Sequence, residues 1–261
     1  MNIIVLIKEV PDMERVRFDR ERGVVDRASA SAEINPFDLY ALQAAADLKA
    51  EYGAYVTVVS MGPERCADSL QDAVARGADA CVCVTDRRFG GADTYATSKT
   101  LAAAVARLDY DLILCGEKSV DGDTAQVGAG VAELLDIPHS YYVEKIDVGE
   151  GEVTLTTADI CGSKQQRRMK LPALVSVGRS IASPRLPELK RKIDSISADV
   201  KMLGLEDLTA LSEDEVGAKG SPTKVSKIVI PEDSRRDGEI FRDEISFIEA
   251  VKAAARGGGK S

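Results

Sequence analysis

The chain has 261 residues, of which 43 are Asp or Glu and 34 are Lys or Arg, and its formal net charge is -9. A negative surface repels a phosphate backbone, which argues against a nucleic acid as partner. No run of about 18 apolar residues occurs, which argues against insertion into a membrane.

Side chains for catalysis or metal binding are scarce. The five cysteines form an odd number without C-x-x-C spacing, which favours reduced thiols in a cytoplasmic protein. Cys81 and Cys83 alternate along an expected strand, so both should lie on one of its faces. Because His139 is the only histidine, neither a Ser-His-Asp arrangement nor a histidine metal cluster can form. We expect no catalytic side chain and no metal, and any chemistry would belong to a bound cofactor.

Short apolar runs alternate with helical patterns in the first half of the chain, which is typical of parallel βαβ units. The expected strands are residues 3–7, 55–60, 80–84 and 112–115. The first helix should be capped by Asn35, begin at Pro36 and end before Gly53. Further helices should begin near Pro63 and Asp93. Residues 8–34 form a long insertion that contains a small hairpin.

The segment 116–128 follows a buried strand and opens a helix. Asp123 is the expected N-cap, Gln126 would complete a capping box, and Thr124 adds a hydroxyl donor. Such a helix start presents unpaired backbone N–H groups at one place, which is a site for an anion. An ordinary well-capped helix explains the same pattern. Asp121 and Asp123 are a carboxylate pair whose expected role is structural.

The pattern changes after Pro138. Residues 141–148 and 153–157 predict two antiparallel strands, followed by strands near 165–170 and 171–177. We expect residues 1–193 to form the nucleotide- or flavin-binding α/β domain and residues 194–261 to form a C-terminal arm. One amphipathic helix over about 239–256 would place Ile240, Phe241, Ile245, Ile248 and Val251 on one face. This face must be buried on its own domain or on a partner, and the length of the arm favours a partner.

These elements predict a doubly wound, Rossmann-like, mostly parallel sheet with an antiparallel hairpin extension and a C-terminal arm. In such sheets the ligand lies beyond the carboxyl ends of the strands, at the topological switch point. Several helix N-termini would meet there, which favours a nucleotide.

Several motifs in order resemble the beta (small) subunit of the electron-transfer flavoproteins. They are residues 8–12 (KEVPD), 34–42 (INPFDLYAL), 58–63 (VVSMGP), 77–79 (GAD), 121–128 (DGDTAQVG), 171–175 (LPALV) and 183–185 (SPR). The match is collinear over about residues 1–190, and residues 220–225 (GSPTKV) are also like bacterial members. The resemblance implies an adenine-nucleotide-hydrolase-like fold.

The resemblance also implies a heterodimer in which the arm, residues 194–261, packs on an FAD-bearing alpha subunit. Beta subunits of this family bind AMP or, in flavin-bifurcating members, a second FAD. The positions that match the family's cofactor site are Leu6, Asn35, Pro36, Phe37, Asp38, Met61, Gly116, Glu117, Lys118, Ser119, Val120, Asp121, Gly122, Asp123, Thr124, Ala125, Gln126 and Val127.

Residues 87–98 look like the loop and helix start of the bifurcating members. Asp93, Thr94 and Thr97 would form a second capped helix start whose hydroxyls reach a flavin. This implies a bifurcating FAD that accepts electrons from NADH and passes them to the alpha-subunit FAD, to a dehydrogenase and to a low-potential acceptor such as ferredoxin or flavodoxin. Ordinary capping by Asp93 is the simpler explanation, and a non-bifurcating subunit with structural AMP is the alternative.

The resemblance also implies a docking residue at Leu189, where the family's hydrophobic anchor meets a flavin dehydrogenase such as an acyl-CoA dehydrogenase.

Two alternative functions come from other classes of protein. A free-standing ATP-binding stress-type module would share the sheet but would not need the arm. A conventional NAD-dependent dehydrogenase would need a glycine fingerprint after the first strand, and residues 8–12 contain no glycine.

Overall fold

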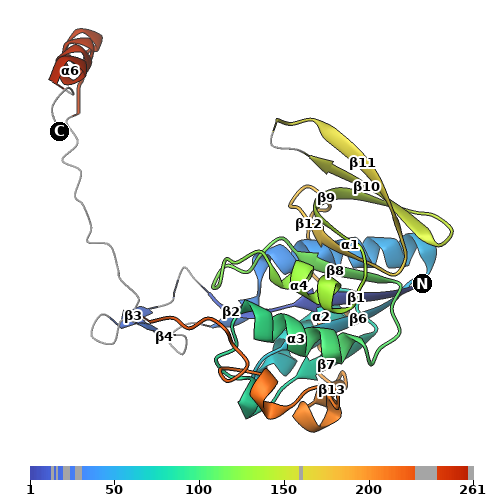
Figure 1. Cartoon of the computed structure of the whole chain (residues 1–261). Helices are drawn as coiled ribbons and strands as arrows, with labels where there is room; N and C mark the ends of the chain where they lie inside the picture. The colour runs from blue at the N-terminus through green and yellow to red at the C-terminus, as the bar shows by residue number, and fades with distance from the viewer. Residues whose placement is uncertain are drawn as a thin grey trace. The chain divides into compact units, whose positions relative to one another are not determined.

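A computed structural model of the chain describes residues 1–12, 15, 17–19, 24–26, 31–158, 161–226 and 240–257. Two compact units, Met1–Ser226 and Lys227–Ser261, follow one another along the chain. The first unit contains the sheet and all the residues expected to bind a cofactor (Figure 1).

The first unit is built on a nine-stranded sheet with the order β11-β10-β9-β12-β8-β1-β6-β7-β13. The strands are β1 (Asn2–Ile7), β6 (Tyr55–Met61), β7 (Ala80–Val84), β8 (Leu112–Gly116), β9 (His139–Val148), β10 (Glu152–Ala158), β11 (Lys164–Lys170), β12 (Ala173–Val177) and β13 (Val200–Leu203). Two small sheets pair β2 (Glu9–Pro11) with β5 (Ala32–Ile34) and β3 (Arg17–Asp19) with β4 (Val24–Asp26). The hairpin expected in the long insertion is therefore confirmed.

Parallel pairing follows from burial on both faces. β8 and β12 are buried along their whole length, as strands covered on both sides must be, and they pair in parallel. β1 lies between β6 and β8 and is parallel to both. The chain moves outward from β1 to β6 and β7 on one side and then returns to β8 on the other, so the switch point lies between β1 and β8.

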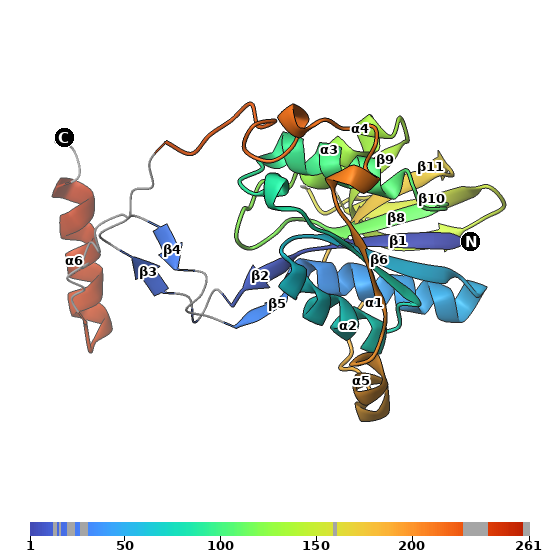
Figure 2. The ribbon, with the colours of Figure 1, turned by 90° about the horizontal axis from the view of Figure 1, so that it is seen from below.

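Helices cover the two faces of the sheet, which confirms the doubly wound architecture (Figure 2). On one face α1 (Pro36–Tyr52) and α2 (Ala67–Ala75) bury Leu42 and Leu70 against the strands. On the other face α3 (Thr94–Val105) and α4 (Val127–Leu134) bury Leu101 and Val131. Short 3-10 turns are η2 (Glu64–Cys66), η3 (Arg87–Phe89), η4 (Leu205–Asp207) and η5 (Glu213–Glu215).

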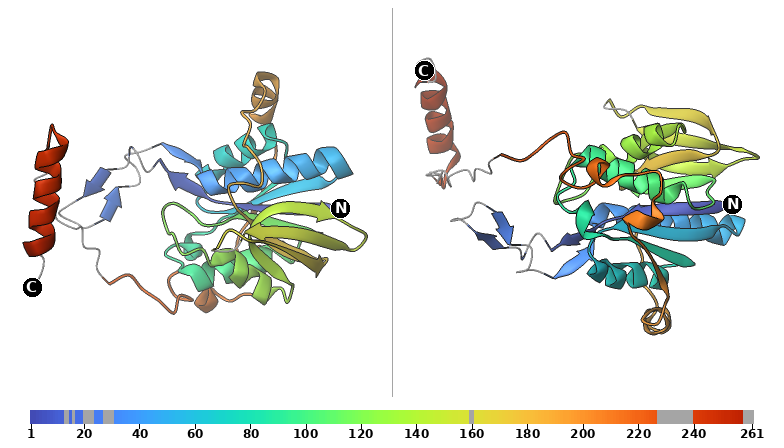
Figure 3. Two further views of the ribbon diagram at one scale, coloured as in Figure 1. Left: turned by 90° about the horizontal axis from the view of Figure 1, so that it is seen from above. Right: turned by 60° about the horizontal axis from the view of Figure 1, so that its bottom comes forward.

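The antiparallel extension is also confirmed. β10 pairs antiparallel with both β9 and β11, while β9 joins the main sheet parallel to β12 (Figure 3, yellow-green strands). The basic strand β11 forms one edge of the sheet and is exposed along most of its length. Its cations thus lie in solvent, as expected for an edge strand.

The end of the first unit differs from the expected boundary at residue 193. After α5 (Leu189–Ser195), β13 pairs in parallel with β7 and extends the sheet, and the unit continues to Ser226. β13 has only four residues, and two of them are exposed. Such a short, half-exposed edge strand has too little apolar periodicity to be predicted from sequence.

The second unit contains α6 (Glu244–Gly257), which begins later than the expected residue 239. Ile245, Phe247, Ile248 and Val251 are all exposed. None of the helices in the described parts of the chain combines the length and apolarity needed to cross a membrane.

Candidate functional site

The site expected from sequence lies at the carboxyl ends of β1 and β8, and we call it the rim. Asp38, in the first turn of α1, joins these two strand ends. Its Oδ2 atom accepts a hydrogen bond from Lys8 N at 2.8 Å, and its Oδ1 atom accepts one from Gly116 N at 3.2 Å. The carboxyl group is buried, and this burial raises the pKa of Asp38 to about 7.

The start of α1 differs from the prediction in one respect. Pro36 occupies the first turn as expected and is exposed, but the side chain of Asn35 does not cap the helix. Instead, Asn35 Nδ2 donates to the carbonyl of Lys118 at 2.8 Å, and Val120 N donates to Asn35 Oδ1 at 3.2 Å. Asn35 therefore holds the loop after β8 rather than its own helix.

Gly116 is required by close approach of backbone. A Cβ atom there would lie 2.5 Å from Asp38 Oδ1 and 2.7 Å from the carbonyl carbon of Phe37. No side chain fits at these distances, so the first turn of α1 can approach the end of β8 only beside a glycine.

Two lysines fix the loop between β8 and α4. Lys8 Nζ binds both carboxylate oxygens of Asp121, at 2.7 and 2.8 Å, and the Asp121 side chain is only 8% exposed. Lys118 Nζ lies 2.7 Å from Asp123 Oδ1. These two carboxylates therefore hold the loop through ion pairs and not as residues of a helix start.

The predicted capping box at Asp123 is wrong. α4 begins at Val127 with Gln126 in the N-cap position, and no side chain caps it. Asp123 and Ala125 have φ values of +52° and +55°. A left-handed residue cannot act as an extended N-cap, so the chain makes two sharp turns before the helix starts. Asp123 N donates to the carbonyl of Ser119 within this loop.

These turns leave several amides available. Among the described residues, no protein acceptor is found for the N–H groups of Thr124, Ala125, Gln126 and Val127. Thr124 and Gln126 are exposed. Successive backbone amides at a helix N-terminus attract an anion such as a phosphate.

The start of α3 agrees with the prediction, because Asp93 is its N-cap and Asp93 Oδ1 accepts from Ala96 N at 3.0 Å. Its other oxygen is also occupied. Oδ2 accepts from Thr223 N at 2.9 Å and from Thr223 Oγ1 at 2.7 Å. Asp93 N in turn donates to Ser221 Oγ at 2.8 Å. Asp93 therefore joins α3 to the end of the first unit.

The N-terminal ends of α3 and α4 lie side by side. Ser98 Oγ lies 2.8 Å from the carbonyl of Thr94 and 3.3 Å from that of Val127. A Cβ atom on Gly130 would come within 2.5 Å of the same hydroxyl. Thr97, one turn into α3, donates its N–H to the carbonyl of Asp93. The structure thus brings the two predicted helix starts together.

The apolar residues of the expected site separate into two places. Leu6 and Met61 pack in the core between the sheet and the helices α3 and α4. The Phe37 ring belongs to the start of α1, where Lys118 Nζ lies 5.6 Å and the Arg179 guanidinium 4.8 Å from its centroid. Leu6 is buried in this core and Met61 is half-buried, whereas the Phe37 ring contacts two cations.

The other residues expected to bind a cofactor lie in the loop between β8 and α4. Glu117, Ser119 and Val120 are half-buried in the first part of the loop, and Gly122 lies close to Lys8 Nζ, with 3.9 Å from that atom to an ideal Cβ. The described residues contain no group of three or more His, Cys, Asp or Glu that could hold a metal ion.

Leu189, the predicted docking residue, is the first residue of α5 and is 77% exposed. Neighbouring Leu186 is 88% exposed. The helix is held against α2 by the ion pair between Lys192 and Asp72 and by Gln71 Nε2, which donates to the carbonyl of Ile196 at 3.0 Å.

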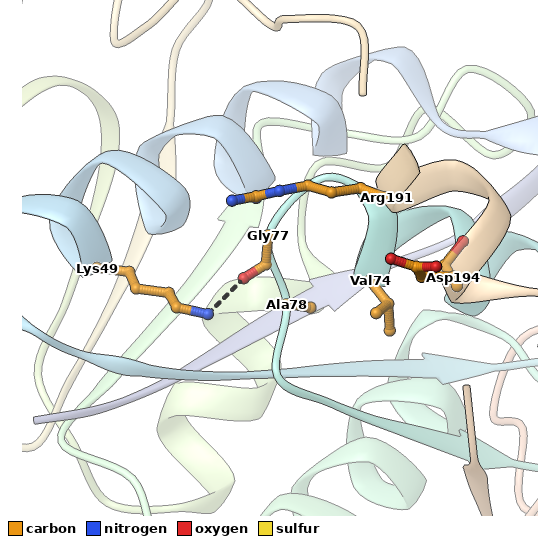
Figure 4. Close-up of a pocket in the computed structure, with 7 residues that line it drawn as sticks. Lys49, Val74, Gly77, Ala78, Arg191 and Asp194 are labelled. Atoms are coloured by element: carbon orange, nitrogen blue, oxygen red, sulfur yellow. Dashed lines mark hydrogen bonds between the residues drawn. The ribbon is translucent and has the colours of Figure 1, made fainter. Parts of the chain in front are cut away.

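A hollow lies between α1, α2 and α5 (Figure 4). Lys49, Arg191 and Asp194 contribute its charges. Lys49 Nζ already donates to the carbonyl of Gly77 at 3.0 Å and to Asp79 at 2.6 Å. The hollow lies apart from the rim residues, and its lysine is satisfied within the chain.

Sequence reasoning missed the residues that support the rim from elsewhere. Ser98 and Thr223 are examples, and Tyr141 is another, since its Oη atom accepts from Ala129 N at 2.7 Å in the first turn of α4. Lys8 was expected at this place in the sheet, because it follows a buried strand at the switch point, but not as a residue that fixes the loop. Thr223 is 130 residues from Asp93, and no local pattern indicates that contact.

Comparisons of the sequence with known proteins show which family the chain resembles. Residues 22–201 match the electron transfer flavoprotein domain family. The chain is 41% identical over 253 residues to the electron transfer flavoprotein subunit beta of Thermoanaerobacterium thermosaccharolyticum, covering 97% of this chain and 95% of that protein. It is 42% identical over 227 residues to the subunit of the same name from Clostridium acetobutylicum, covering 87% of each. It is 35% identical over 233 residues to the caffeyl-CoA reductase-Etf complex subunit CarD of Acetobacterium woodii, covering 88% of each.

Proposed function

Because the chain belongs to the electron transfer flavoprotein family and resembles its beta subunits, we propose that it is the beta subunit of a heterodimeric electron carrier and binds a bifurcating FAD at the rim. Electron transfer is the activity of the family. The finer assignment depends on whether the rim residues suit a dinucleotide with a diphosphate.

The unpartnered amides of residues 124–127 are the observation that carries this proposal. They lie next to the first turn of α3, because Ser98 contacts both helix starts. The unpartnered amides at the start of α4 suit a phosphate group of a dinucleotide, and the start of α3, where Asp93 already accepts from Ala96 N, would add hydroxyl groups instead of amides. Met61, which is half-buried, would supply apolar surface for an adenine beside them, whereas Leu6 is buried beneath it in the same core cluster.

Thr94 and Thr97 are the residues that favour FAD over AMP. They stand in the segment 87–98 that resembles the bifurcating branch, and both are half-buried at the start of α3. Hydroxyls at that place would bind the ribityl chain of a flavin. When bound, the flavin supplies both one-electron and two-electron transfer. The chain's own role is to hold and orient it and to keep water from its face.

Asp38, Asp93 and Asp121 have a different role in this proposal. Their carboxylate oxygens accept hydrogen bonds from within the chain, so they position the backbone of the rim and do not bind the cofactor. This arrangement also suits an anionic ligand, because Lys8 pairs with Asp121 and burial favours the neutral form of Asp38.

The proposed donor is NADH, and the proposed acceptors are the FAD of the alpha subunit and a low-potential carrier such as ferredoxin or flavodoxin.

The alpha subunit would cover the arm. Support for this comes from α6, whose Ile245, Phe247, Ile248 and Val251 are exposed within the second unit and need a covering surface.

A flavin dehydrogenase is the proposed third partner, and Leu189 is the proposed anchor. The residue is exposed at the start of α5 and is followed by Lys190, Arg191 and Lys192. An apolar side chain among cations suits a transient complex that is guided by charge.

A nucleotide inventory tests the proposal. The chain is co-produced with its alpha subunit, purified, denatured, and the released FAD and AMP are counted per heterodimer. Two FAD support the bifurcating assignment. One FAD and one AMP would overturn it and leave the alternative, a non-bifurcating beta subunit with structural AMP. A chain that purifies alone with ATP would instead be a free-standing stress-type module.

A further inference from the structure

Two thiols of the first unit lie in direct contact between β7 and the start of α2. Cys66 Sγ and Cys83 Sγ are 2.8 Å apart, and both residues are completely buried. Cys83 comes from the buried strand β7, whereas Cys66 ends η2 and directly precedes α2. A disulfide bond has an S–S length of about 2.05 Å, so the sulfur atoms need to approach by less than about 1 Å to bond.

We propose that Cys66 and Cys83 form a modification site at which hydrogen peroxide generates an intramolecular disulfide. The Cys66 thiolate attacks the peroxide, its sulfur is oxidised to a sulfenic acid, and one water leaves after protonation. The Cys83 sulfur then attacks the sulfenic sulfur, the S–S bond forms, and a second water leaves. The two thiols lose two electrons and two protons, and the peroxide is reduced to two water molecules.

The pKa shifts of the two thiols and the position of Cys66 at the start of α2 indicate which thiol attacks the peroxide. The hydrogen bond from Cys83 lowers the pKa of Cys66, and Cys66 also lies at the N-terminus of α2, where a negative charge is stabilised. The hydrogen bond to Cys66 and burial raise the pKa of Cys83. Burial likewise raises the pKa of Cys81 to about 12. Cys66 is thus the attacking thiol and Cys83 the resolving one.

The charged neighbours of the pair are already joined to one another. Glu9 disfavours the Cys66 thiolate and Arg65 favours it. Glu9 Oε1 accepts from Arg65 Nε at 3.1 Å, and its Oε2 accepts from Ser69 Oγ at 2.9 Å. This ion pair weakens the repulsion between the Glu9 carboxylate and a thiolate at Cys66.

One short turn separates the two thiols from solvent. Pro63, Glu64 and Arg65 are all exposed, and Cys66 is the next residue. Opening the single turn η2 would therefore bring Cys66 to solvent without unfolding the sheet. Cys81 lies on the same face of the same strand as Cys83, but its sulfur hydrogen-bonds to the carbonyl of Leu70. It has the same burial without a thiol partner.

The test is peptide mapping of the full chain under non-reducing conditions after treatment with hydrogen peroxide. We expect a linked peptide pair containing Cys66 and Cys83, lighter by two hydrogen atoms than the separate peptides and separated again by dithiothreitol. The linked pair should disappear in Cys66→Ala and in Cys83→Ala and persist in the matched control Cys81→Ala.

Oxidation of the exposed Cys161 in the same sample shows that the peroxide was active. If Cys161 is oxidised and Cys66 and Cys83 remain thiols, the proposal is wrong. It is also wrong if Cys66 is converted to a sulfinic acid without cross-linking. The wild-type result decides both points, so the test does not depend on the folding of a variant.

Discussion

The Oδ1 atom of Asp38 accepts a hydrogen bond from the backbone N–H of Gly116 at 3.2 Å, in the interior of the first unit. The second carboxylate oxygen binds Lys8 N at the end of the neighbouring strand. One side chain thus satisfies the amides at the ends of β1 and β8, where the topology leaves a crevice. The rim depends on this link, because the loop that carries the unpartnered amides begins at Gly116.

Replacement of Asp38 by Asn should change how stability depends on pH. Burial raises the pKa of Asp38 from 3.8 to about 7, so between these values the folded protein holds a proton that the unfolded chain has lost. Stability therefore falls as the pH rises from about 4 to about 7 and then becomes constant. Asp38→Asn cannot lose this proton, so its stability should fall less over that range.

The measurement is urea denaturation of both proteins at several pH values between 4 and 7.5. The difference between the two curves isolates Asp38, since all other groups are shared. Asn can accept only one of the two N–H bonds, so the variant should also lose about 1–3 kcal/mol at the acidic end. Parallel curves for the two proteins would contradict the assignment of this titration to Asp38.

Replacement of Gly116 by Ala should damage the rim directly. The new Cβ atom would lie 2.5 Å from Asp38 Oδ1 and 2.7 Å from the backbone of Phe37, so α1 must move away from β8. Overpacking of this kind costs about 1–3 kcal/mol. Gly149→Ala is the matched control, because a Cβ there meets nothing closer than 3.5 Å.

Thermal denaturation and nucleotide content of the complex report the two expected effects. Gly116→Ala should melt at a lower temperature and retain less FAD or AMP, whereas Gly149→Ala should match the wild type. Full nucleotide content in a destabilised Gly116→Ala protein would show that the β8 end does not shape the binding site.

Elements with strong local patterns were predictable from the sequence, and contacts between distant segments were not. The strand β1, the helix α1 with Pro36 in its first turn and the cap at Asp93 follow from apolar runs and capping residues. The capping box at Asp123 failed because its residue types fit a helix start, while Lys118 binds the carboxylate instead. Composition does not reveal that the backbone there turns with positive φ values.

The site itself could be located but not fully assembled. Topology places the rim at the ends of β1 and β8, so the expected residues around Gly116 were brought together. The segment of residues 200–223 escaped prediction because β13 is short and because Ser221 and Thr223 act through hydrogen bonds to Asp93, which is distant in sequence. Such contacts leave no periodic signal.

Variants of Asp93 should separate two functions of one carboxylate. Asp93→Asn keeps an oxygen for the cap at Ala96 N, but its amide nitrogen cannot accept from Thr223 N or Oγ1. Asp93→Ala loses both contacts and should cost about 1–2 kcal/mol through the cap alone. We expect faster amide hydrogen exchange at Thr223 in both variants, and faster exchange at Ala96 only in Asp93→Ala.

Asp243→Ala is the control for Asp93. Asp243 accepts from Ser246 N in the second unit, so its loss should leave exchange at Thr223 and Ala96 unchanged. Equal protection of Thr223 in the wild type and in Asp93→Asn would show that the contact with Thr223 does not hold the end of the first unit.

Leu189→Ala tests the proposed docking surface. Leu189 is 77% exposed, so its removal should not disturb the core. An anchor residue typically contributes more than about 1 kcal/mol to a complex, which corresponds to at least roughly a fivefold loss of affinity. Electron transfer between the heterodimer and an acyl-CoA dehydrogenase should therefore slow at low dehydrogenase concentration, with flavin content unchanged.

Leu186→Ala is the matched control, because Leu186 has the same side chain, is 88% exposed and precedes α5. It should transfer electrons like the wild type. An equal loss in both variants would assign docking to the whole segment and not to Leu189. Unchanged transfer in Leu189→Ala would remove this residue from the interface.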